Sequence, residues 1–318
     1  MAAQMKPGWS RPSTILFASE FPADEKAFAF SLSLATEFGA QLIIFHVFNG
    51  IEQPASPSAA HRSNEFANAR QARLRLESLC QRAGGIGVQC KVVVRSGRPA
   101  DRILAFLHER RIDRVVMGAH SPGPIGKLLV GSVAEAVIRN ANVPVCIVGP
   151  NVVEASYRNC AARKILCDVS KQEISHLLAT FGAELASSHS ASLVLHRVIT
   201  PHERESLAGR TLDQIETELP SLLPLSILQK VPVRTRAAFG DPIEELLYHG
   251  RSQKANLIVL GAHGASQFAA ITRAGTLYKI LAYAHCPVIT LSPVVLAECG
   301  ASEVGLGSSE VQYLAGVI

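Results

Sequence analysis

The feature that most constrains this chain is an internal duplication. Four apolar landmarks recur in the same order in the two halves of the sequence, which is the signature of two copies of one folding unit. The landmarks, each followed by its repeat, are 15–17 and 165–167, 42–46 and 193–196, 115–120 and 258–263, and 142–145 and 285–288. His46 and His196 lie 150 positions apart, whereas Gly118 and Gly261 lie 143 apart. The second copy is therefore about seven residues shorter than the first between its second and third landmarks.

Each unit alternates short β-rich apolar runs with segments of helical period, which is typical of βαβ units that form a parallel sheet. The runs lack polar alternation, as expected for strands covered on both faces. We expect strands at 14–19, 41–48, 88–95, 113–119 and 144–148, and at 164–169, 192–199, 231–239, 256–262 and 287–291. We expect helices in unit one at 23–38, 64–83, 99–110 and 131–140. In unit two, Pro220 and Pro224 should end the second helix near Leu219.

The repeat pattern divides the chain into two domains with flanking segments. The expected division is an N-terminal tail at 1–11, domain 1 at 12–150, a linker at 151–162, domain 2 at 163–293 and a C-terminal tail at 294–318. The glycine- and serine-containing C-terminal tail loses the pattern of the domains. We expect it to be poorly ordered.

Composition narrows the class of protein. Hydrophobic residues make up 48% of the chain and charged residues 18%, which supports large cores. The net charge of +5 suits an anionic small ligand and equally an ordinary solvated surface, and a dedicated nucleic-acid surface is not expected. Seven cysteines without a CxxC pair predict a reducing, cytoplasmic setting. The first 13 residues contain no signal-peptide core, and no apolar run is long enough to cross a membrane.

A glycine-containing loop follows the fourth predicted strand of each unit. In open parallel sheets, ligands bind beyond the carboxyl ends of the strands. In unit one the loop runs from Gly118 to Gly131-Ser132, where a helix begins, and in unit two it runs from Gly261 to Gly275-Thr276. Free N–H groups, a hydroxyl group and the positive end of a helix dipole favour phosphate at such a point. By themselves, however, such loops are more often plain turns.

At these residues the sequence resembles a tandem member of the universal stress protein family. The family's ATP-binding branch has the signature Gly-x2-Gly-x9-Gly-(Ser/Thr) after the fourth strand, and unit one keeps this spacing with Ser121 at the second glycine. The phrase Gly-Ser-Val-Ala-Glu at 131–135 precedes a Val-Pro-Val strand, as in the family. The resemblance covers 12 to 293. It implies two five-stranded parallel α/β domains with helices on both faces, a Rossmann-like fold of the adenine nucleotide alpha hydrolase type.

The resemblance also implies site residues. Glu20 matches the family's acidic residue after strand one, and Val47 matches the position against adenine. The residues expected to bind nucleotide in domain 1 are Ala18, Ser19, Glu20, Val47, Met117, Gly118, His120, Ser121, Gly131, Ser132, Val133 and Ala134. A weaker second site is expected at Gly261, His263, Gly264, Gly275 and Thr276.

Unit two departs further from the signature. Its gap from Gly264 to Gly275 is one residue too long, and Ser170 takes the acidic position. Counting from His196, Arg197 stands at the position of Val47 and would fill the base pocket. Unit two is therefore expected to be a degenerate site.

The leading hypothesis is a cytoplasmic stress-response regulator that binds ATP or a related adenine nucleotide, with Mg²⁺ as an optional companion. No catalytic motif or paired carboxylate is present, so at most slow hydrolysis of ATP is expected. The alternative is a nucleotide-free tandem scaffold whose two sheets pair through their fifth strands and which acts through protein contacts, as a homo-oligomer or with another protein. A third reading is a hydrolase that cleaves adenylates. Neither nucleic acid nor membrane is an expected partner.

Overall fold

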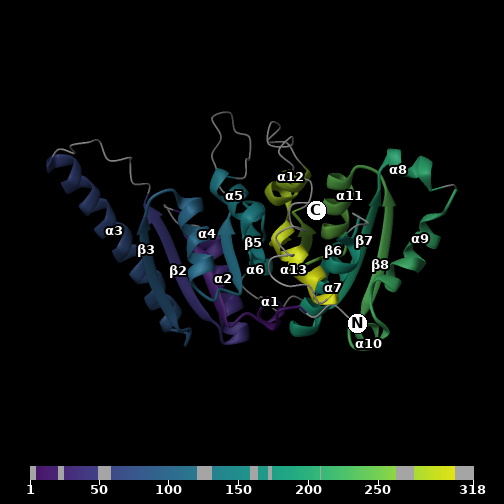
Figure 1. The fold of residues 1–318 in the computed structure, drawn as a ribbon, viewed down its shortest axis with the longest axis horizontal. Helices are drawn as coiled ribbons and strands as arrows, with labels where there is room; N and C mark the ends of the chain where they lie inside the picture. The colour runs from purple at the N-terminus through teal and green to yellow at the C-terminus, as the bar shows by residue number, and fades with distance from the viewer. Residues whose placement is uncertain are drawn as a thin grey trace.

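The two units form one continuous ten-stranded sheet covered by helices on both faces (Figure 1). The computed structural model describes residues 5–20, 25–48, 59–119, 131–157, 164–170, 174–207, 209–262 and 276–304. The strands are β1 (Thr14–Ala18), β2 (Gln41–Phe48), β3 (Cys90–Ser96), β4 (Arg114–Gly118), β5 (Val145–Val148), β6 (Lys164–Asp168), β7 (Ser192–Ile199), β8 (Val233–Phe239), β9 (Leu257–Gly261) and β10 (Val288–Leu291). All ten predicted strands are confirmed.

Within each unit the strands are parallel, and their order places β1 and β6 at the centre of the two halves. The order across the sheet is β3-β2-β1-β4-β5-β10-β9-β6-β7-β8. The chain therefore leaves β1 toward β2 on one side and returns to β4 on the other. A crevice opens at such a reversal beyond the carboxyl ends of the strands.

Helices of both units line the two faces of the sheet and bury a separate apolar core on each. One face is covered by α2 (Glu25–Phe38), α3 (Ala59–Gly84) and α7 (Ser175–Ser188). The other is covered by α4 (Pro99–Glu109), α5 (Ser132–Asn140), α11 (Pro242–Ser252) and α12 (Thr276–Tyr283). Each core runs without a break from one unit into the other. The fold class expected from the sequence is confirmed.

The second helical region of unit two is divided, as its prolines predict. It consists of α8 (Pro201–Ser206), α9 (Leu212–Glu218), the 3-10 helix η2 (Leu219–Leu222) and α10 (Leu225–Leu228). Thr200 and Thr211 cap α8 and α9 through reciprocal hydrogen bonds with Glu203 and Gln214. Helix α9 ends one residue before Leu219, in agreement with the prediction.

The two units join through β5 and β10, which pair antiparallel, so the fifth strands do meet as the scaffold hypothesis required. Val288 lies opposite Ile147, and all three residues that pair from β10 are buried. Thr290 and Ser292 donate side-chain hydrogen bonds to the carbonyl groups of Val145 and Ala141, at 3.2 and 2.6 Å. Each unit thus covers the apolar edge that the other would expose to pairing.

The expectation of a plain N-terminal tail at 1–11 is wrong for its described part. Helix α1 (Pro7–Ser10) packs against α7 of unit two, and Trp9 is 2% exposed. The guanidinium of the buried Arg114 donates to the Trp9 carbonyl, and the Ser188 hydroxyl donates to the Ser10 carbonyl at 2.8 Å. Tertiary burial of one indole holds this short segment across both units.

The expectation of a poorly ordered C-terminal tail is also wrong for its first part. Helix α13 (Pro293–Val304) continues directly from β10 and packs against α5, α7 and β10. Val295, Leu296 and Cys299 are at most 1% exposed, because they complete the core beside α7. Glu298 forms an ion pair with Lys6, so the two terminal segments meet. The remainder of the tail, 305–318, lies outside the described residues.

We predict that Trp9→Ala lowers the free energy of unfolding by about 3 kcal/mol, because a buried aromatic side chain leaves a cavity between the units. Urea unfolding followed by circular dichroism measures the change. Leu225→Ala, at a side chain that is 77% exposed, is the control and should change stability by less than about 0.5 kcal/mol. Equal, small effects of the two variants would show that α1 does not join the units.

Candidate functional site

A cavity of about 400 Å³ opens beyond the carboxyl ends of β1, β2 and β4 in unit one. Every residue that was predicted to bind nucleotide in unit one, and that lies in the described part of the chain, lines this cavity. The lining residues are Ala18, Ser19, Glu20, Phe45, His46, Val47, Phe48, Pro99, Ile103, Met117, Gly118, Gly131, Ser132, Val133 and Ala134. The structure therefore brings together residues from five separate segments at the reversal point of the sheet.

The inner part of the cavity is apolar. Phe45 and Val47 come from β2, Met117 from β4 and Ile103 from α4. Phe45 stacks on Phe106 with ring centroids 4.8 Å apart, which holds its ring in place. Such a surface suits a flat, uncharged ring better than a charged group.

Polar groups lie at the ends of β1 and β2. The backbone N–H of Ser19 donates to the Phe45 carbonyl at 2.8 Å, which fixes the chain where it leaves β1. His46 Nδ1 lies 2.9 Å from the Ser19 carbonyl, so the ring orders this turn. The Ser19 hydroxyl is buried and has no hydrogen-bond partner among the described residues. Ser19 lines the cavity, but its hydroxyl oxygen lies below the cavity surface.

Helix α5 begins at the cavity without a side-chain cap. Gly131 is its N-cap residue and has no side chain that could accept a hydrogen bond from the first turn. The N–H groups of the first turn therefore lack helical partners and carry the positive end of the helix dipole. Ser132, Val133 and Ala134 supply this turn, and all three line the cavity. An anionic group is favoured here.

Several predicted residues lie outside the described part of the chain. These are His120, Ser121, His263, Gly264 and Gly275. Of the second predicted site, Gly261 ends β9 and Thr276 begins α12.

The sequence prediction omitted Phe45, His46, Phe48, Pro99 and Ile103 from the binding residues, although they line the cavity. Two signals in the sequence point to them. The last residues of β2 reach the same edge as Val47, and the Gly97-Arg98-Pro99 turn starts a helix beside that edge. Ile103, one turn into α4, follows only from tertiary packing.

The alignment of the two units around His196 is wrong by one residue. Ala18 pairs with Phe45 in unit one, and Asp168 pairs with His196 in unit two. His196 therefore occupies the position of Phe45, Arg197 that of His46, and Val198 that of Val47. The reason is one extra residue that precedes β7: Gly39 and Ser190, both with positive φ, end the preceding helices 151 positions apart. Arg197 thus does not replace the residue expected against adenine.

Unit two differs from unit one at another point of the site. Asp168 stands where unit one has Ala18, and its carboxylate accepts hydrogen bonds from the backbone and hydroxyl of Ser170. The Ser170 hydroxyl also accepts from the Val198 N–H at 2.9 Å. These bonds tie together the ends of β6 and β7 at the place where unit one keeps Ala18 in the cavity wall. They also place a carboxylate there.

A pair of histidines replaces the pair of phenylalanines. His196 and His249 occupy the positions of Phe45 and Phe106, with ring centroids 4.9 Å apart. The His196 side chain is fully buried, and neither of its ring nitrogens has a partner among the described residues. Burial, and secondarily His249, lowers the pKa of His196 from 6.5 to about 3. Glu245 on the same helix lies 3.6 Å from His249 Nε2.

Comparison with known proteins places the chain among related sequences. The model of the universal stress protein family matches residues 13–149 and 161–292. A universal stress protein of Methanocaldococcus jannaschii is 29% identical over 27% of this chain and 54% of its own length, so the match spans about half of that relative. One of Mycobacterium tuberculosis is 23% identical over 64% of this chain and 70% of its own length.

Solved structures show the same fold. A universal stress protein from Archaeoglobus fulgidus superimposes with a TM-score of 0.69 at 14% identity, covering 89% of this chain and 97% of that one. A putative universal stress protein from Pseudomonas aeruginosa gives a TM-score of 0.60 at 13% identity, covering 93% and 99%. At these identities the likeness concerns the fold alone.

The histidine pair predicts acid sensitivity. Because the pKa of His196 is lowered by folding, the unfolded chain binds more protons between pH 6.5 and 3, and stability falls with pH in that window. We expect a loss of about 1 kcal/mol between pH 7 and 5.5 from this residue. Urea unfolding across this pH range tests it.

The matched control is the double variant His196→Phe/His249→Phe, which installs the residues of unit one. It should lose most of the pH dependence, and half-buried His285, whose pKa burial also lowers, should account for what remains. An unchanged pH slope in the double variant would refute the assignment.

Proposed function

Since the chain belongs to the universal stress protein family, we propose that its first unit binds ATP or a related adenine nucleotide. The observation that carries the proposal is the cavity of unit one. An apolar wall and the uncapped start of α5 line this same cavity. Adenine needs a flat apolar surface, and phosphate needs N–H donors and positive potential. The residues present fit both parts.

The chain's own residues have separate roles in this proposal. Val47 and Met117 contact the base. The first turn of α5, from Ser132, faces the phosphate groups. Glu20 is the sole carboxylate among the lining residues, so a Mg²⁺ ion would depend mainly on phosphate oxygens.

The corresponding residues of unit two support the proposal that nucleotide binds in unit one. The carboxylate of the site moves from Glu20, whose position Ser170 takes in unit two, to Asp168 at the position of Ala18. The buried His196, beside His249, takes the place of Phe45. With Val198 in the position of Val47, the base side is less altered than the sequence suggested. The displaced carboxylate and the imidazole ring are what disfavour nucleotide in this unit.

We further propose that nucleotide occupancy regulates a stress response through a partner protein rather than through catalysis. Groups of three or more metal-ligating side chains are absent from the described residues. No helix in that part of the chain is long and apolar enough to cross a membrane. Slow hydrolysis of bound ATP, in a cytoplasmic setting, is the most chemistry this proposal includes.

We predict that Gly131→Asp abolishes ATP binding, with an affinity loss of at least about tenfold. A carboxylate at the N-cap accepts hydrogen bonds from the first N–H groups of α5, and its negative charge repels phosphate. Gly131→Asn caps the same helix without charge and is the matched control, expected to keep most of the affinity. Both variants should leave the melting temperature unchanged or slightly raised, and calorimetric titration with ATP measures the affinity.

The second candidate function is a nucleotide-free scaffold. The pairing of β5 with β10 favours it, because the chain's own strands and the Thr290 and Ser292 hydroxyl groups join the two units. Mass spectrometry of the protein purified without added ligand, followed by calorimetry, separates the two functions. Absence of co-purified nucleotide and of heat at millimolar ATP would leave the scaffold as the function.

A further inference from the structure

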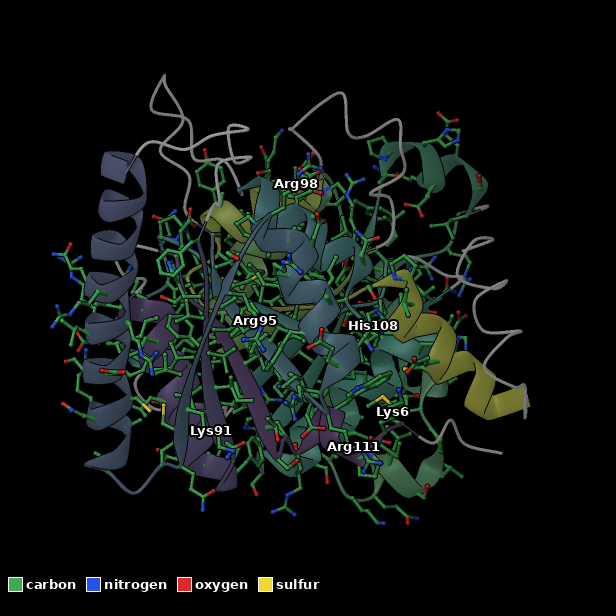
Figure 2. The ribbon with its side chains drawn as sticks, turned by 60° about the vertical axis from the view of Figure 1, so that its left-hand side comes forward. Lys6, Lys91, Arg95, Arg98, His108 and Arg111 are labelled. Carbon is green, nitrogen blue, oxygen red and sulfur yellow. The ribbon has the colours of Figure 1, made fainter. Side chains whose placement is uncertain are left out.

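A basic surface follows the outer edge of unit one (Figure 2). We call Lys91, Arg95, Arg98 and Arg111 the basic edge. Lys91 and Arg95 belong to β3, Arg98 precedes α4 and Arg111 follows it. All four side chains are exposed, and Figure 2 shows them on the face that carries β3 and α4, together with His108.

The basic edge belongs to unit one only. Between 91 and 111 there are six Lys and Arg residues against two acidic residues, Asp101 and Glu109. The equivalent stretch of unit two, 234–254, has four against three. In particular, Arg98 corresponds to Asp241, which caps α11. The shared fold therefore does not require the basic residues.

Three of these cations, Lys91, Arg95 and Arg111, have no carboxylate partner in the described part of the chain. Among the described residues, none lies within ion-pair distance of Lys91, Arg95 or Arg111. Arg95 donates only to the carbonyl of its neighbour Val94, at 3.3 Å. These cations are held at the surface without an intramolecular counter-charge from the described part of the chain.

The backbone of β3 adds a second recognition element. β3 is the last strand of the sheet and pairs only with β2. Leu42 N–H donates to the Gln89 carbonyl and Gly97 N–H to the Phe48 carbonyl, so the odd-numbered residues of β3 bond to β2. The N–H of Val94 consequently points away from β2, as a strand edge does when it can accept another chain.

The opposite end of the sheet shows what such an edge binds. Ala237 of β8 occupies the position of Val94, and its N–H donates to a carboxylate oxygen of Glu216 at 2.8 Å. The other oxygen of Glu216 lies 3.4 Å from Arg236. One acidic side chain from α9 thus satisfies an outward N–H and pairs with a neighbouring arginine. At Val94, no described side chain takes this place.

We propose that the β3 edge of unit one is a docking surface for an acidic segment of a partner protein. Carboxylates of the segment occupy the place beside Val94 that Glu216 occupies beside Ala237, and the basic edge supplies the charge complement. Nucleic acid fits less well, because single strands stack on aromatic rings and Tyr248 and Tyr283, the exposed tyrosines of the described chain, lie in unit two.

A fluorescein-labelled peptide of alternating Glu and Thr, titrated with the full chain and followed by anisotropy, tests the proposal. We expect saturable binding that the alternating Gln and Thr peptide does not show. The triple variant Lys91→Glu/Arg95→Glu/Arg111→Glu should weaken binding at least about tenfold. Arg234→Glu/Arg251→Glu/Lys254→Glu makes the same change of charge in unit two and should weaken it less than about twofold.

Val94→Pro tests the backbone contribution, because proline removes the outward N–H without removing a bond to β2. It should weaken peptide binding while the melting temperature stays within a few degrees of the parent chain.

The proposal is overturned if the acidic peptide does not bind, or if both triple variants weaken binding equally. It is also overturned if a single-stranded oligonucleotide or phosphatidylserine vesicles bind as tightly as the acidic peptide and the unit-one triple variant loses that binding. ATP titration of that variant is an independent readout of the cavity.

Discussion

The antiparallel pairing of β5 with β10 is the contact on which the rest of the structure depends. Two short apolar strands, each at the end of its own parallel sheet, hydrogen-bond to each other and become interior strands. This removes two aggregation-prone edges and lets one core on each face extend through both units. Next to this pairing, α12 approaches the end of β5 so closely that only glycine fits at 149, where a Cβ atom would lie 2.4 Å from the Leu281 carbonyl oxygen.

The same backbone carries different chemistry in the two units. Phe45 and Phe106 form an apolar pair beneath the cavity of unit one, and His196 with His249 occupies the same place in unit two. A phenyl ring loses nothing polar on burial, whereas an imidazole ring gives up hydrogen bonds to water unless it finds partners. The buried, unpartnered His196 therefore makes the second unit the more acid-sensitive copy.

Much of the fold and part of the candidate site could be predicted from local sequence patterns. Strands such as 42–47 are visible because a buried parallel strand is apolar throughout, and proline divides the second helical region of unit two wherever it falls. Gly118 at the end of β4 was found because the carboxyl edge of a parallel sheet is where ligands bind, whereas the residues at the end of β1 came from the family resemblance. Residues that reach the cavity from α4, such as Ile103, give no such local signal.

The sequence by itself determined that the chain contains two copies of one α/β unit, since repeated apolar runs and turn residues are local properties. Only the tertiary structure decided how the copies correspond at β7, because one extra residue ahead of the strand moves His196 onto the position of Phe45 without changing the apolar pattern. It also decided the fate of the terminal segments. Trp9 and the first turns of α13 are ordered by burial against α7, a contact between residues far apart in the chain that no local pattern records.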